Sequence, residues 1–193
     1  MTPRVSIDSD TVSSLGRAGH DIGLGALIGG NLFGRLAMHP SLAEVSNETE
    51  RGKVLNRSWQ RYGPVNGVAL GTIVAGWGGA RLGEARPGLL SQRERKLALA
   101  KDAAVGAVAL TGLATMVQGI RFAASAPDGA VPMETGETTS ELAPPKSARL
   151  KGAINVLSSL HLASALTLAG VNAALGQANF RRPPKRRVLK GRY

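Results

Sequence analysis

The sequence predicts an all-α protein whose four helices form an integral membrane bundle. Charge is segregated along its 193 residues, and three segments carry none: 62–80, 103–120 and 152–180. A helix crosses the hydrocarbon core of a bilayer with about 20 residues, and about 17 are enough. All three segments reach that length, although the mean hydropathy of the whole chain is close to zero, at −0.01.

The first span is the least apolar of the four. Only 22–34 lacks charge, and Asp21 and Arg35 stand at its edges. Long charged side chains near the end of a span reach the membrane surface, so we expect a span here as well. A run of this length also fits a buried core helix, which remains the alternative. The four spans are expected at 18–38, 62–80, 103–124 and 152–178.

The distribution of basic residues predicts the orientation. Lys and Arg are more frequent in short cytoplasmic loops than in external ones. If the amino terminus is cytoplasmic, fifteen basic residues fall on the cytoplasmic side and nine on the external side. We therefore expect a multi-pass protein of the cell membrane with both termini in the cytoplasm.

The segments between the spans differ in composition. Residues 1–14 form a loose polar tail, and the long external loop after the first span mixes apolar residues with charges, as an interfacial helix does. The cytoplasmic loop breaks at Pro87-Gly88 before a basic helical segment. The second external loop, 127–145, is rich in Pro, Gly and Thr, and we expect it to be flexible. The membrane domain thus covers 15–180.

The basic tail at 181–193 carries much of the net charge of +11. Each basic residue near a membrane surface gains about 1 kcal/mol from anionic lipid headgroups, so we expect the tail to contact membrane lipids. We expect no nucleic-acid partner, because the positive charge lies where membrane topology places it. The chain has no cysteine, which excludes disulfides and thiolate metal sites. Its abundance of Ala, Gly and Arg is typical of a GC-rich bacterial genome.

Small residues predict close helix packing. Glycines four residues apart lie on one face of a helix and let a second helix approach closely. Such pairs are common in membrane spans and indicate packing rather than chemistry. The pairs that we expect to pack are Gly25 with Gly29, Gly30 with Gly34, and Gly67 with Gly71.

Polar residues inside the spans are the candidate site. At helical rise, Asn31, Gln118 and His161 each lie about 10–14 Å from the outer end of their spans, and they form one polar layer. Ser158 shares the helix face of His161. The amides have a structural explanation, because such groups often join helices by hydrogen bonds. His161 is the stronger functional candidate, since imidazole transfers protons near neutral pH.

The histidines do not predict a metal site. His20 and His39 lie at opposite ends of the first span, about 28 Å apart at helical rise. His161 lies between them in depth and is too distant from either to share an ion. We expect neither a metal nor another cofactor.

Three short motifs resemble a known family. They are "MHPSL" at the end of the first span, "SWQRYGPVNG" before the second, and "LSSLHLASAL" in the last. Together they resemble the anthrone-oxygenase-like family of four-span membrane proteins, and the similarity covers roughly 15–180. The long loop after the third span and the basic tail depart from that pattern. The matching residues are His39, Pro40, Trp59, Tyr62, Leu160 and His161.

The resemblance implies oxidation of an electron-rich aromatic, an anthrone or a phenol, by oxygen without a cofactor. Removing a proton from such a substrate yields a carbanion that reacts with oxygen, so the protein needs a general base in a dry apolar pocket. His161 is then the catalytic base. Asn31 and Gln118 would orient the substrate oxygens. Trp59 and Tyr62 would form an aromatic wall, and Ser158 would also contact the substrate.

A non-catalytic accessory subunit or scaffold is the alternative. Its glycine-rich faces, long external loop and basic tail suit docking within a homo-oligomer or a larger membrane complex. Transport is less well supported, because four short spans lack the paired broken helices of inverted-repeat transporters.

Overall fold

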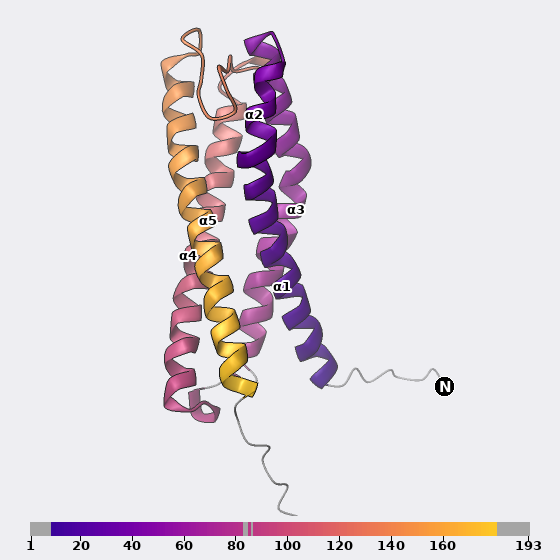
Figure 1. Ribbon diagram of the computed structural model, residues 1–193, viewed down its shortest axis with the longest axis vertical. Coiled ribbons are helices and arrows are strands. Elements are labelled where there is room, and N and C mark those ends of the chain that lie inside the picture. Colours follow the sequence, from indigo (N-terminus) through magenta and orange to yellow (C-terminus); the bar gives the residue numbers. More distant parts are fainter. Residues whose placement is uncertain (1–8, 83–84, 86, 181–193) are drawn as a thin grey trace, which may run out of the picture.

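Four long helices dominate the computed structural model, which describes residues 9–82, 85 and 87–180. They are α1 (Ser9–Phe33), α3 (Glu48–Leu82), α4 (Gln92–Ala123) and α5 (Pro145–Phe180). The helices alternate in direction, so that α1 begins and α5 ends at the same end of the bundle (Figure 1). Over these residues the all-α prediction is confirmed, and the only β pairing is an isolated bridge between Met133 and Thr139.

The predicted tails lie largely outside the described residues. This holds for 1–8 and for the basic tail at 181–193. Residues 9–14, which we expected to be loose, form the first turns of α1.

Two of the helices are long and apolar enough to cross a membrane. These are α4 and the 145–178 part of α5, while α1 and α3 carry more charge. Large apolar side chains also face outward, among them Ile22, Leu36 and Leu110, each more than 70% exposed. An apolar outer surface of this kind is typical of helices that contact lipid. The sequence and the outer surface together support a membrane location.

A wide turn follows the carboxy-terminal end of α1. A π-helical turn, η1 (Gly34–Met38), leads into α2 (His39–Ser41) and a short 3-10 turn, η2 (Leu42–Glu44). The backbone N–H of His39 bonds to the carbonyl of Gly34, five residues back. Pro40 follows directly, and because it has no N–H it cannot form the next regular bond. The wide turn therefore falls where proline disrupts the α-helical ladder.

The predicted interfacial helix is wrong as a separate element. Its residues form the first turns of α3, which continues without a break through Pro64. The Asn47 side chain starts this helix by accepting hydrogen bonds from the N–H groups of Thr49 and Glu50, at 2.9 and 3.0 Å. Within this segment Trp59 packs on Gly34 and Leu55 is buried against the strap residues Val131 and Met133, whereas Val54 is 44% exposed.

The helices pack most closely in two pairs, α1 with α3 and α4 with α5. Ile73, Val108 and Leu168 are fully buried where the pairs meet. Among the predicted packing glycines, Gly30 lies under the Tyr62 ring and Gly34 under the Trp59 ring. A side chain added at the other four would meet no atom within 4 Å: Gly25, Gly29, Gly67 and Gly71.

The α4–α5 connection, residues 124–144, closes the end of the bundle opposite the start of α1, and we call it the strap (Figure 1). It contains the 3-10 turn η4 (Pro127–Gly129). We expected flexibility here, but Val131 and Met133 are fully buried. The Met133 N–H bonds to the Glu48 carbonyl at 3.0 Å, and the Ser140 hydroxyl bonds to the Glu48 carboxylate at 2.5 Å. The strap is therefore packed onto the start of α3.

At the opposite end, the α3–α4 connection behaves as its composition predicts. A 3-10 turn, η3 (Pro87–Leu89), precedes α4. Ser91 and Glu94 then form a reciprocal capping box, with each side chain bonded to the other residue's N–H.

Candidate functional site

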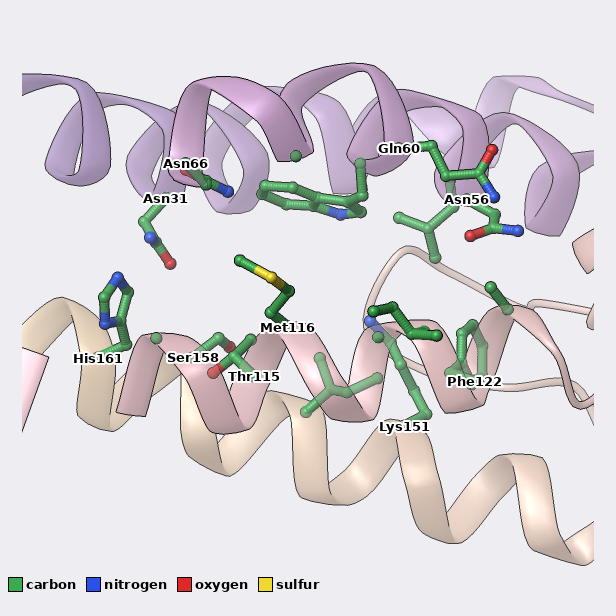
Figure 2. Close-up of a pocket in the computed structure, with 18 of the residues that line it drawn as sticks. Asn31, Asn56, Gln60, Asn66, Thr115, Met116, Phe122, Lys151, Ser158 and His161 are labelled. Atoms are coloured by element: carbon green, nitrogen blue, oxygen red, sulfur yellow. The ribbon is translucent and has the colours of Figure 1, made fainter. Parts of the chain in front are cut away.

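A cavity of about 660 Å³ lies between the two helix pairs, in the half of the bundle nearest the strap. Its size is within the range of about 300–1,000 Å³ that is usual for small-molecule sites. Figure 2 shows side chains from facing helices pointing into it, with Met116 near its middle. The lining is mainly apolar, with polar groups gathered toward the two ends.

His161 stands at the deep end of the cavity. Its Nδ1 lies 3.1 Å from the Thr111 hydroxyl, and that hydroxyl donates to the Ala107 carbonyl at 2.6 Å. The hydroxyl must therefore accept from an Nδ1–H group, which leaves the lone pair on Nε2. The ring also has a hydrogen bond to the Val108 backbone, and no side chain among the described residues bonds to Nε2. His161 is thus held in the tautomer that accepts a proton at Nε2.

Two amides accompany His161 at this end. Asn31 and Asn66 lie beside it in Figure 2, on α1 and α3 respectively. The Asn31 amide donates to the Leu27 carbonyl at 3.1 Å, which directs one of its N–H groups along its own helix. Its oxygen has no partner among the described residues, so it is available to a ligand.

Two cations line the rest of the cavity. Arg35 donates to the hydroxyls of Ser158 and Ser159, at 2.9 and 2.7 Å, so its guanidinium lies about one turn of α5 from His161. Lys151 lies at the far end and is only 5% exposed. Both residues count among the nine basic residues of the expected external segments, but the structure turns them into the cavity.

A histidine–carboxylate pair joins α2 to the strap at the mouth of the cavity. His39 Nδ1 lies 2.9 Å from the Glu137 carboxylate, and the His39 ring meets the Trp59 ring edge-on at 6.0 Å between centroids. Burial lowers the pKa of His39 below its ordinary 6.5, although the bond to Glu137 opposes this effect. His39 is therefore neutral near pH 7 and donates its Nδ1–H to the carboxylate.

The pKa of Glu137 is lowered as well. Burial raises this pKa, but the hydrogen bond to His39 and the charges of Lys151 and Arg35 outweigh it. Glu137 is thus a carboxylate near neutral pH. The mouth of the cavity carries a fixed negative charge on the strap, beside the positive charges of α1 and α5.

Of the predicted site residues, four line the cavity together: Asn31, Trp59, Ser158 and His161. Two do not. The Tyr62 hydroxyl donates to the Ala26 carbonyl at 2.9 Å, so this ring serves the α1–α3 contact. Gln118 lies on α4 away from the lining, and its side-chain oxygen is buried without a partner among the described residues.

Sequence reasoning missed several lining residues, among them Arg35, Asn66 and Lys151. One signal was available on α1, where Leu27, Asn31, Arg35 and His39 recur every four residues. On a regular α-helix such steps drift by about 40° each. The π-helical turn rotates less per residue, so it brings His39 back to the same face.

A second polar cluster, which we did not predict, borders a cavity of about 460 Å³ at the opposite end of the bundle. Asp21 Oδ1 lies 2.9 Å from His20 Nδ1 and accepts from the Asn172 amide at 2.9 Å. The Lys101 ammonium donates to the Asn172 oxygen. These contacts join α1, α4 and α5.

The same cluster reaches α3 through Asp102. This carboxylate accepts from the Trp77 indole at 2.7 Å and pairs with Arg81 at 3.0 Å. Lys101 also lies 4.4 Å from the Trp77 ring centroid, a cation–π contact. We interpret the cluster as a clamp across the end of the bundle opposite the strap.

The residues described contain no group of three or more His, Asp or Glu placed to hold a metal ion. No family model, curated protein or solved structure matches the chain. The resemblance to the anthrone-oxygenase-like family therefore stays a prediction, and function is argued from the cavity itself.

Proposed function

We propose that this chain is a four-span membrane protein, with both termini in the cytoplasm, that binds a hydrophobic aromatic molecule in the cavity beneath the strap. The helix lengths, the outward apolar side chains and the bias of basic residues support the membrane arrangement. The α1–η1 segment and α3 contain more polar residues than α4 and α5. Three of these residues, Asn31, Arg35 and Asn66, line the cavity, where they are turned away from lipid. Polar groups turned inward in this way are typical of functional membrane bundles.

We infer further that the bound molecule is oxidised without a cofactor, with His161 as general base. The observation that carries this step is the free Nε2 of His161, held by Thr111 at the end of an apolar cavity. Nε2 removes a proton from an activated ring CH₂ group, and the carbanion reduces oxygen. One oxygen atom stays on carbon as a carbonyl, and the other leaves as water.

The role of His161 is tested with the purified protein in detergent, using anthrone as substrate and oxygen uptake as the readout. A positioned general base accelerates the reaction by about 10²–10⁴-fold, so His161→Ala is expected to lower kcat by about that factor. Thr111→Val removes the acceptor that sets the tautomer, and we expect a smaller loss with an altered pH profile. Thr167→Val is the matched control, because Thr167 is exposed on α5. Unchanged turnover in folded His161→Ala would contradict the proposal.

The glycine faces favour a second candidate, a scaffold that packs against another membrane helix. Gly25, Gly29, Gly67 and Gly71 leave open space on the outside of the bundle. Close approach of a partner helix would fill that space. Absence of turnover, together with an oligomer that Gly67→Leu dissociates, would favour the scaffold over the enzyme.

A further inference from the structure

The mouth of the cavity holds an unpaired buried cation. Lys151 is 5% exposed, and its ammonium makes no hydrogen bond or close ion pair with any described residue. Figure 2 shows its side chain directed into the cavity, toward the facing helices. Withdrawing an ammonium from water without a partner is costly. A ligand group that offsets this cost would explain why the cation lies there.

The surroundings of Lys151 compensate its charge only in part. Arg35 adds a second cation, and its contacts in the cavity are neutral serine hydroxyls. No carboxylate is found among the described residues that line the cavity. Glu137 is the acid whose charge acts on Lys151, but its carboxylate is bonded to His39. The lining is therefore positive at this end.

We propose that the cavity binds a hydrophobic aromatic acid, with its carboxylate at Lys151 and its ring system extending past Arg35 toward His161. The inference rests on the proposed function and names its substrate class. Lys151 and His161 are ten residues apart on α5, or about 15 Å at helical rise. Apolar side chains, Met116 and Trp59 among them, line the space between these two ends. The ligand is thus elongated, acidic at the outer end and reactive at the deep end.

Binding to the full-length protein in detergent tests the charge requirement. The probes are anthraquinone-2-carboxylate, its uncharged partner 2-methylanthraquinone, and palmitate as a non-aromatic acid, each followed by equilibrium dialysis. A charge-assisted hydrogen bond in a buried site makes the aromatic acid bind at least about tenfold more tightly than the neutral probe. Lys151→Met abolishes that preference. Lys146→Met, on the exposed face of the same helix, preserves it.

The outcomes separate this inference from the proposed function. Equal binding of the two anthraquinones, or a preference that survives Lys151→Met, overturns the inference while leaving a hydrophobic aromatic site. Tighter binding of palmitate than of the aromatic acid overturns the aromatic assignment and favours a lipid acid. Failure of all three probes to bind overturns the proposed function as well. Lys151→Gln gives the same test if the Met variant is not monodisperse.

Discussion

At the scale of single residues, the His39–Glu137 pair is the point where the strap meets the helices. The bond crosses from α2 to a segment almost one hundred positions further along the chain, and Gly136 packs directly on the His39 side chain. Both residues have lowered pKa values, His39 chiefly through burial, and Glu137 in spite of its burial through its hydrogen bond to His39 and the charges around it. The pair should therefore make the closure of the strap sensitive to acid.

We expect the protein to lose stability as the pH falls through and below 6.5, the ordinary pKa of histidine, and we assign part of that loss to His39. The unfolded chain takes up a proton near pH 6.5, whereas folded His39 resists it, so acid favours unfolding. Glu137 acts in the same direction at lower pH, since its stabilising contribution is lost as the pH falls through its lowered pKa. His39→Gln should lower the melting temperature at neutral pH and reduce its dependence on pH, as measured by thermal denaturation in detergent.

Glu141→Gln is the control for this experiment. Glu141 is an exposed carboxylate of the same strap, so its removal should leave the pH dependence as it is in the wild type. An identical pH dependence in wild type and His39→Gln would show that other groups cause the acid sensitivity.

At the scale of elements, the strap depends on a close backbone contact with α3. A Cβ atom built at Gly52 would lie 1.9 Å from the Val131 carbonyl oxygen, which is far inside contact distance. The clash involves backbone on both sides, and no side-chain rotation can relieve it. Glycine at this position therefore allows the strap to seat on the helix and bury Val131 and Met133.

Gly52→Ala should destabilise the protein by about 1–3 kcal/mol, as overpacking does in other well-packed interiors. We also expect the strap to open, so that limited proteolysis cuts within 124–144 in the variant before it cuts the wild type. Gly67→Ala is the matched control on the same helix, because its Cβ would meet no atom within 4 Å. We expect Gly67→Ala to leave the free energy of unfolding unchanged or to raise it by up to about 1 kcal/mol, because alanine has a higher helix propensity than glycine. Equal effects of the two substitutions would contradict the contact.

At the scale of the whole molecule, the bundle has an apolar exterior and a partly polar interior. Leu110 on α4 and Ile22 on α1 are 72% and 73% exposed, whereas His161 is 5% exposed. In water this arrangement would expose a large apolar surface, which is unfavourable. In lipid the same side chains contact apolar acyl chains, so their exposure is not unfavourable. Inward-facing polar groups, Asn31 and His161 among them, instead gather around the cavity and around the clamp at the opposite end of the bundle.

Leu110→Asp tests the membrane arrangement. An acidic residue at the centre of a span costs about 2.5–3.5 kcal/mol on insertion scales, so we expect a marked loss of membrane-inserted protein after cell fractionation. Leu99→Asp is the control, because Leu99 is also exposed on α4 but lies before the expected span. Full insertion of both variants, or recovery of the wild type from the soluble fraction, would contradict the four-span proposal.

Local pattern was sufficient to predict the helices and part of the site. Uncharged runs show where helices lie, because a span is specified by consecutive residues. The same depth argument put Asn31 and His161 at one level, and both line the cavity. Extending α3 back to Glu48 was not predicted, since the charged residues in that stretch resemble a surface helix until α1 is seen beside it.

The rest of the site depended on how the helices turn toward one another. Arg35 and Lys151 count as external charges in the sequence, yet packing directs both into the cavity. Tyr62 faces α1 because Gly30 admits its ring, and Gln118 faces away from the cavity although its depth suits it. Depth follows from position along one helix, but rotation about the helix axis is set by contacts with its neighbours. Those contacts join residues far apart in the chain, and no local pattern records them.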